Sequence, residues 1–232
     1  VMSYNIHYGT GMDGKNSMRA IAELIKEQNP DIVGLQEIGD SIMDQKFAEM
    51  TGMQVVLGPS IDGRMDGYGD AILSKYPFEY EGNYSIPSAS SSRYQAMAVK
   101  VDFSAKSKDL GVVRLINTHF DWLETIGSEN ARLATIDVIE EAFMKADPNF
   151  PTLLTGDLNS RPQSKVLGKL KKMGWVNSSG NKEYFTIDSD NPTMQIDYVL
   201  FRPAKKLKVT NFYVMDGVLS SDHLPVVAEI TF

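Results

Sequence analysis

Apolar segments of strand length recur along this chain, and polar side chains stand at their ends. Six of them carry Asn, Asp, Glu or His there, within NIHYG, PDIVGLQEI, NTHFDW, TGDLNS, QIDYVL and SDHLPV. A buried strand tolerates a polar side chain only when that group is hydrogen-bonded or binds an ion. One such strand end has an ordinary structural explanation. Six together predict strand ends that converge on one polar site.

Between these segments the sequence predicts many strands and few helices. Helices are expected over 18–28, 45–50, 129–145 and 163–174, from apolar periodicity with Asn-Pro or Gly at the ends. Besides the opening strand, strands are expected over 31–38, 53–58, 69–75, 78–86, 94–103, 111–120, 151–157, 195–201, 208–215 and 224–232. With no linker or repeat, this order predicts two packed sheets with helices outside, in a single domain over 1–232.

The first turn has the glycine spacing of a dinucleotide-binding site. Gly9, Gly11 and Gly14 match G-x-G-x-x-G, a pattern with a high false-positive rate. A dinucleotide-binding strand is apolar on both faces. The strand expected here alternates instead. Its apolar row is made of Met2, Tyr4, Ile6 and Tyr8, and its polar row of Ser3, Asn5 and His7. The alternation favours a polar site and predicts that the glycines form a flexible turn.

The charge balance bears on the class of substrate. The chain has 23 Lys and Arg against 30 Asp and Glu, a net charge of −7. Nonspecific nucleic-acid binding requires a basic surface that displaces phosphate counterions. The two local basic clusters, 169–172 and 205–208, are interpreted as solvated. The balance disfavours bulk DNA binding and is compatible with a small anionic substrate.

Other sequence features limit the kinds of site and the location. The chain of 232 residues has no cysteine, so a disulfide framework and a thiolate metal site are excluded. No apolar run is long enough to span a bilayer. The first strand begins almost at Val1, which predicts a chain trimmed at its start; a removed export signal would fit, and the compartment stays open. The oligomeric state also stays open.

The ordered set of segments resembles the endonuclease/exonuclease/phosphatase superfamily, which includes deoxyribonuclease I, exonuclease III and the neutral sphingomyelinases. The matching segments run from residue 5 to about residue 226 and are NIHYG, PDIVGLQEI, YGDAILSKYP, NTHFDW, TGDLNS, QIDYVL and SDHLPV. The resemblance implies an α/β fold, a four-layer α/β/β/α sandwich of two mostly antiparallel sheets with helices outside. It also implies metal-dependent hydrolysis of phosphate esters.

The resemblance assigns roles to ten residues. Asn5 and Glu37 resemble the family's metal-site pair, and Asp222 resembles the acid beside the metal. Asp157 and Asn159 resemble the pair that positions the attacking water and the scissile phosphate. His223 resembles the catalytic histidine, and Asp197 the acid that orients it. His119 resembles a second histidine found in some branches of the family. His7 and Arg93 are expected to contact the substrate.

Three positions depart from the family pattern. His7 stands where several nucleases carry an acid. Asp70 stands where relatives often carry Asn or an apolar residue. Arg93 lies in a segment that matches an Arg-containing strand only loosely. The roles of these three residues stay open.

The proposed ligands point to a hard divalent cation. Carboxylate and amide oxygens suit Mg²⁺ or Mn²⁺, and magnesium keeps several waters. With only three histidines, His7, His119 and His223, an all-histidine site would use every imidazole in the chain. The sequence therefore predicts a site for Mg²⁺ or Mn²⁺.

Four hypotheses about the function are compared with these sequence features. The first is a phosphodiesterase or phosphatase acting on a small-molecule or lipid phosphate ester. A metal-dependent nuclease is disfavoured by the acidic balance and by the lack of a basic groove interleaved with aromatics. A catalytically silent binding module is disfavoured because every expected acid, amide and histidine is present. A cofactor-binding oxidoreductase is disfavoured by the polar row of the first strand.

Overall fold

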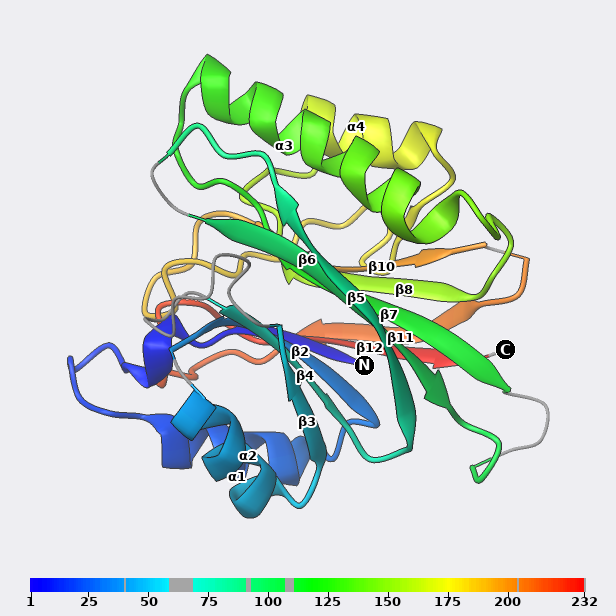
Figure 1. The fold of residues 1–232 in the computed structure, drawn as a ribbon. Coiled ribbons are helices and arrows are strands. Elements are labelled where there is room, and N and C mark those ends of the chain that lie inside the picture. The colour runs from blue at the N-terminus through cyan, green and yellow to red at the C-terminus, as the bar shows by residue number, and fades with distance from the viewer. Residues whose placement is uncertain (40, 59–68, 91–92, 107–110, 204, 232) are drawn as a thin grey trace.

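The computed structural model describes residues 1–39, 41–58, 69–90, 93–106, 111–203 and 205–231, without the side chains of residues 41, 42 and 44. Within these residues the strands form two sheets of six that pack face to face, with helices on both outer faces (Figure 1). The predicted α/β/β/α sandwich is confirmed. Among the described residues no helix is both long and apolar enough to cross a membrane.

The first sheet has the strand order β11-β12-β1-β2-β4-β3. In it β1 and β2 run parallel and the other described neighbours run antiparallel. Helices α1 and α2 cover its outer face (Figure 1). The bounds are β1 Met2–Asn5, α1 Met18–Gln28, β2 Ile32–Ile38, α2 Ser41–Thr51, β3 Gln54–Leu57, β4 Gly69–Ser74, β11 Lys208–Val214 and β12 Val226–Thr231.

The second sheet has the order β5-β6-β7-β8-β10-β9. Its one parallel pair among the described strands is β7 with β8. Helices α3 and α4 cover its outer face (Figure 1). The bounds are β5 Phe78–Ile86, β6 Tyr94–Asp102, β7 Val112–His119, α3 Ile126–Ile139, β8 Thr152–Asp157, α4 Lys165–Lys172, β9 Val176–Asn177 and β10 Asp197–Arg202.

Helix α1 illustrates how the sequence pattern builds an outer layer. Ile21 and Ile25 are four residues apart, so they share one face of the helix, and both are buried against the first sheet. Each such side chain stabilises the fold by roughly 1.5–3 kcal/mol. The helix ends where Asn29 adopts a left-handed conformation, directly before Pro30. The predicted bounds 18–28 are confirmed.

The space between the sheets is apolar toward one end and polar near the strand ends. Ile72, Val99 and Leu115 belong to the apolar part. In the polar part Gln36 Nε2 donates to Asn117 Oδ1 at 2.6 Å, and Asn117 Nδ2 donates to the Leu35 carbonyl at 2.7 Å. These bonds connect the two sheets and pair both polar atoms of the Asn117 amide, as buried polar groups require.

A glycine allows the sheets to approach at this point. Gly34 lies in β2, and a Cβ on it would collide with the side chains of Asn117 and Thr155 from the second sheet. The glycine inside the apolar segment DIVGLQEI therefore marks a close contact between sheets.

Four predicted features need correction. β1 ends at Asn5, and a 3-10 turn over His7–Gly9 follows, so the alternation expected through Tyr8 is wrong beyond Asn5. α2 begins four residues before the predicted 45. α3 begins at 126, not 129, because Thr125 caps it by accepting a hydrogen bond from Ser128 N, and it continues as a π-helical turn over Glu140–Met144. The two-residue strand β9 was not predicted.

Candidate active site

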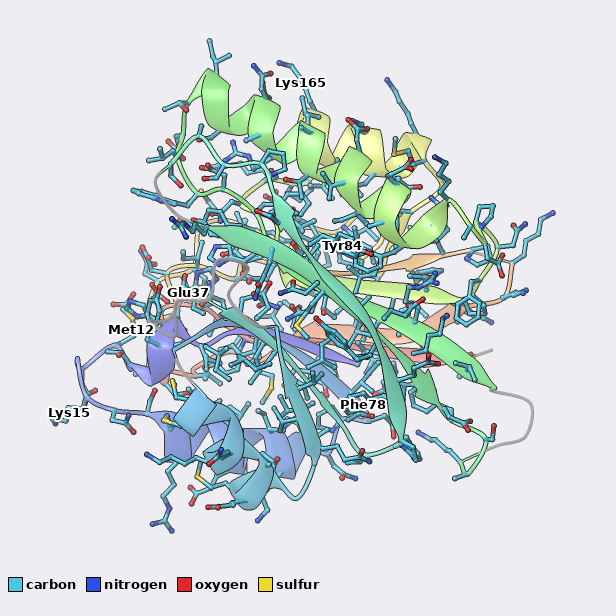
Figure 2. The ribbon with its side chains drawn as sticks, viewed as in Figure 1. Met12, Lys15, Glu37, Phe78, Tyr84 and Lys165 are labelled. Atoms are coloured by element: carbon cyan, nitrogen blue, oxygen red, sulfur yellow. The ribbon has the colours of Figure 1, made fainter. Side chains whose placement is uncertain are left out.

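The strand ends converge as expected. In the second sheet His119 pairs with Asp157, and Asp157 pairs with Asp197, so register places these three residues in one row across β7, β8 and β10. The first sheet contributes Asn5 from the end of β1 and Glu37 from near the end of β2. Figure 2 shows Glu37 at the same end of the molecule as Met12, in the loop after β1.

A single amide joins the two sheets at this end. Asn5 Nδ2 lies 3.1 Å from Glu37 Oε1 and 3.2 Å from Asp157 Oδ2, and it donates to both carboxylates. Asn5 Oδ1 accepts a hydrogen bond from the His7 backbone N–H at 3.1 Å. Asn5 is fully buried, and Asp157 is nearly so. The amide therefore fixes the position of one carboxylate relative to the other.

The His223 ring is oriented by Asp197. His223 Nδ1 lies 2.9 Å from Asp197 Oδ2, so its Nε2 is turned toward Asp157 Oδ2, at 3.7 Å. Ser221 Oγ accepts the His223 backbone N–H at 3.2 Å and donates to the Asn5 carbonyl at 2.8 Å. The 221–223 segment is thereby held against β1.

The second imidazole, His119, lies on the other side of Asp157. His119 Nε2 is 3.5 Å from Asp157 Oδ2 and 3.1 Å from Asn159 Nδ2. Asn159 Nδ2 also donates to the Phe120 carbonyl, and the Asn159 backbone N–H donates to Asp157 Oδ1 at 2.9 Å. Because an amide N–H is a donor, His119 Nε2 accepts from it, which fits a neutral ring.

The buried acids shift one another's protonation. Burial, and then the nearby Asp197 charge, raises the pKa of Asp157. Burial also raises the pKa of Glu37. The pKa of Asp70, which is buried beside Glu37 and Asp157, is raised well above its usual value by burial and by those two charges. This end of the sandwich therefore has more buried negative charge than its donors stabilise.

The two histidines are shifted in opposite directions. Burial, reinforced by His223, lowers the pKa of His119 to about 3. Burial also opposes the charge on His223, but Asp197 outweighs it and raises the pKa of His223 to about 10. The site thus pairs a neutral imidazole with a cationic one, a separation typical of acid–base sites.

Backbone strain is concentrated at the site. Among the described residues, five non-glycine residues have positive φ. Four of them belong to the site or to the turn beside it, and the fifth, Asn29, ends helix α1 away from the site. Glu37 has φ 56° in a bulge of β2 opposite β4, and Asn159 has φ 44°. Such conformations cost of order 1–3 kcal/mol each and persist at functional sites because the surroundings impose them. The other two, His7 and Tyr8, lie in the turn that follows Asn5.

Three of the residues with expected roles lie at the margin. His7 Nδ1 is 3.6 Å from Asp222 Oδ1, with side chains 41% and 31% exposed. Asp222 Oδ1 also lies 3.3 Å from Ser221 Oγ, which donates its proton to the nearer Asn5 carbonyl. Arg93 is exposed and lines a narrow cavity with Asp70 and His119. The structure thus places seven of the ten at the centre and these three at the rim.

The Endonuclease/Exonuclease/phosphatase family model matches residues 2–223. The chain belongs to this family. Its members are hydrolases that act on phosphate ester bonds, and the resemblance seen in the sequence is confirmed.

Individual relatives of this family member differ in what they act on. The chain is 29% identical over 198 residues to a 5'-tyrosyl-DNA phosphodiesterase from Caenorhabditis elegans, covering 82% of this chain and 51% of that one. The chain thus spans about half the length of this curated relative. An endonuclease/exonuclease/phosphatase from Bacteroides vulgatus has a TM-score of 0.82 at 19% identity, covering 99% of this chain and 97% of the other. A mannosyl-6-phosphatase from Bacteroides thetaiotaomicron has a TM-score of 0.78 at 20% identity, covering 100% and 98%. The two solved structures show the shared fold.

The donor set of this family member fits a divalent cation. Glu37 and Asp157 approach one amide nitrogen from two sides. Among the described residues, Asp70 Oδ2 and Asp197 Oδ1 are buried without a hydrogen-bond partner. Asp157, Asp197 and His223 also bring ligand atoms within 4.8 Å of one another, but His223 Nδ1 is occupied by Asp197. The oxygen-rich group around Glu37 therefore suits a hard cation better. Asn5 would offer its oxygen to that cation only after its amide rotates by about half a turn.

The sequence-based site omitted one acid that the structure places in it. Asp70 lies near the start of β4, antiparallel to β2, at the end of the sheet that carries Glu37. The signal was present in the sequence, because GDAILS is another apolar strand with an acid at its end. The glycines of the first turn, in contrast, form the expected non-nucleotide turn: Thr10 bridges Asn16, and Gly14 donates to the Gly11 carbonyl.

Proposed function

We propose that residues 1–232 form a single catalytic domain that hydrolyses a phosphomonoester or phosphodiester with the help of a divalent cation, Mg²⁺ or Mn²⁺. The observation that carries this proposal is the row of His119, Asp157 and Asp197, with His223 and Glu37 meeting it from separate segments. Carboxylates, an amide and two imidazoles at one place can position a water for in-line attack and stabilise the charge of the transition state.

The chain's own residues would divide the work as follows. Asp157 and Asn159 would hold the attacking water in line with the leaving oxygen. His223, cationic and fixed by Asp197, would donate from Nε2 to a phosphate oxygen. His119, neutral and held by Asn159, would contact a second phosphate oxygen or the leaving group. Most of the rate enhancement would come from position and fixed charge.

The cation would have a limited role. Glu37, with Asn5 and Asp222 nearby, would hold it, and it would supply charge neutralisation at the phosphate. Asp70 would add negative charge behind Glu37. His7 and Arg93, at the rim, would contact parts of the substrate beyond the phosphate.

We propose a small-molecule or lipid-linked phosphate ester as the substrate. The net charge of −7 disfavours a long polyanion. A nucleic-acid end is the second candidate, because the Caenorhabditis elegans relative is named a 5'-tyrosyl-DNA phosphodiesterase. A sugar phosphate belongs to the first class, and the fold shared with the mannosyl-6-phosphatase is compatible with it.

A substrate panel tests the proposal. Bis-p-nitrophenyl phosphate, p-nitrophenyl phosphate, mannose 6-phosphate, sphingomyelin, a 5'-phosphotyrosyl oligonucleotide and plasmid DNA are each incubated with Mg²⁺, with Mn²⁺ and with chelator. Cation-dependent release from a small or lipid ester, lost in Asp157→Asn, is the expected result. Turnover confined to the oligonucleotide would favour the second candidate. Full activity in chelator would remove the cation from the proposal.

A further inference from the structure

A larger cavity lies apart from the reacting groups, beneath the second helical layer. It has a volume of about 510 Å³ and lies between α4, β9, β10 and the loop after β9. That volume is within the usual range for small-molecule sites. None of the residues assigned to the hydrolysis lines it. Pro162, Leu167 and Val176 supply apolar surface to it. Leu170, Trp175 and Leu200 also line it, but each is at most 3% exposed and belongs to the packed core beneath the cavity.

The cavity is framed by fixed side chains. Trp175 Nε1 donates to Glu140 Oε1 at 2.8 Å, and Arg202 Nη1 donates to both oxygens of the same carboxylate. In the loop after β9, directly after the lining residue Glu183, the Tyr184 backbone N–H donates to Gln195 Oε1 at 2.9 Å. A preformed cavity binds a ligand without the cost of ordering its walls.

The lysines near this cavity fall into two groups, those paired with an acid and those that are not. Two lysines of α4 that lie away from the cavity are paired with α3: Lys165 Nζ with Glu129 Oε2 at 2.8 Å, and Lys169 Nζ with Asp137 Oδ1 at 2.6 Å. Figure 2 shows Lys165 projecting from this outer layer.

The lysines that line the cavity differ from these. Lys171 and Lys182 form no ion pair with another residue in the part of the chain that the structure describes. Lys182 Nζ instead lies 4.4 Å from the centre of the Tyr184 ring. Glu183 also lines the cavity, and it is paired with neither lysine. Two exposed lysines that form no ion pair among the described residues thus border the cavity.

We propose that this cavity binds an anionic amphiphile. The apolar body of the ligand packs on Pro162, Leu167 and Val176, next to Trp175, and its carboxylate or phosphate head lies at Lys171 and Lys182. Burial of the body supplies most of the affinity, and the lysines select the charge of the head. The proposal does not depend on phosphate ester hydrolysis, because binding at this cavity breaks no bond.

Trp175 provides a direct readout. The chain has two tryptophans, and Trp122 is 55% exposed, so Trp122→Phe leaves Trp175 as the sole indole with little risk to folding. Dodecanoate, dodecyl phosphate and uncharged dodecanol are titrated into this variant below their critical micelle concentrations. We expect saturable changes in Trp175 fluorescence with both anions. The two anions distinguish a fatty acid head group from a phosphate one. Equal affinity for dodecanol, or no change with either anion, would overturn the proposal.

A matched pair of variants tests the lysines. In the same background, the double substitution Lys171→Gln with Lys182→Gln should weaken anion binding about five- to tenfold, the effect of two partly exposed ion pairs. Lys172→Gln removes the same charge from the neighbouring exposed position, which does not line the cavity, and should leave binding unchanged. An equal loss in Lys172→Gln, or no loss in the double variant, would contradict the assignment.

Discussion

Two buried carboxylates at the ends of neighbouring strands have opposite surroundings. Asp121 follows β7 and Asp157 ends β8, and both are buried. Asp157 is crowded by other acids, and its pKa is raised by burial and by Asp197. Burial also opposes the charge on Asp121, yet its hydrogen bonds outweigh burial and lower its pKa. Its donors are Ser88 Oγ, the Ala89 and Ser90 backbone N–H groups, the Leu123 backbone N–H and Ser128 Oγ.

The difference separates a structural acid from a reactive one. Asp121 has enough donors to stabilise its charge, so it ties the 88–90 loop to the start of α3 and needs no further partner. Among the described residues, Asp157 accepts hydrogen bonds with assigned donors only from Asn5 and Asn159, so its charge remains available to water, proton or cation. The same side chain near the ends of neighbouring strands therefore supports either the fold or the chemistry.

Replacing Asp by Asn should mainly lower activity at Asp157 and mainly lower stability at Asp121. The largest effect is expected on kcat at Asp157. Asp157→Asn should lower kcat by about 10²–10⁴-fold, because the carboxylate that holds the attacking water is lost. Its free energy of unfolding in chelator should stay within about 1 kcal/mol of the original chain, since crowding of like charge is relieved as a hydrogen bond is weakened. Steady-state kinetics and urea unfolding measure both.

The structural acid should respond in the reverse sense. Asp121→Asn should lower the free energy of unfolding by about 3 kcal/mol, because an amide cannot accept from donors on both of its ends. The folded fraction should keep kcat within a few-fold, since Asp121 touches none of the reacting groups. If urea unfolding instead showed an unchanged midpoint and kcat fell 100-fold, the contrast between the two acids would be wrong.

The cation site gives the next effect in size. Glu37→Gln keeps the shape of the side chain and removes its charge, so the Mg²⁺ concentration that gives half-maximal activity should rise about tenfold or more. Asp13→Asn, at an exposed acid in the loop after β1, is the control and should leave the titration unchanged. An unaltered Mg²⁺ titration in Glu37→Gln would assign the cation to other oxygens.

The sequence predicted the layers from the order of its strands and helices, and the converging strand ends from the polar side chains that stand there. Strands such as 78–86 and the helix 18–28 have the predicted bounds, since period and end signals agree there. The start of α3 was missed because Gly127 reads as a breaker, whereas the Thr125 cap determines the start.

Asp121 and Asp157 are alike in sequence. Their donors come from residues 88–90 and from residue 5, far along the chain, so tertiary contacts alone distinguish them.

The smallest expected effect is a pH dependence that belongs to Asp121. Its folded-state pKa is lowered by its hydrogen bonds, so the unfolded chain binds a proton at Asp121 more readily than the folded chain does. The stabilisation is therefore complete above the unfolded value of about 4 and is lost as pH falls below it. Arg132 Nη1, which donates to the Asp121 carbonyl, keeps its charge throughout this range. Between pH 6 and pH 3 the original chain should lose about 1 kcal/mol more stability than Asp121→Asn, by urea unfolding at each pH. Parallel curves for the two chains would show that the hydrogen bonds to Asp121 do not favour its charged form.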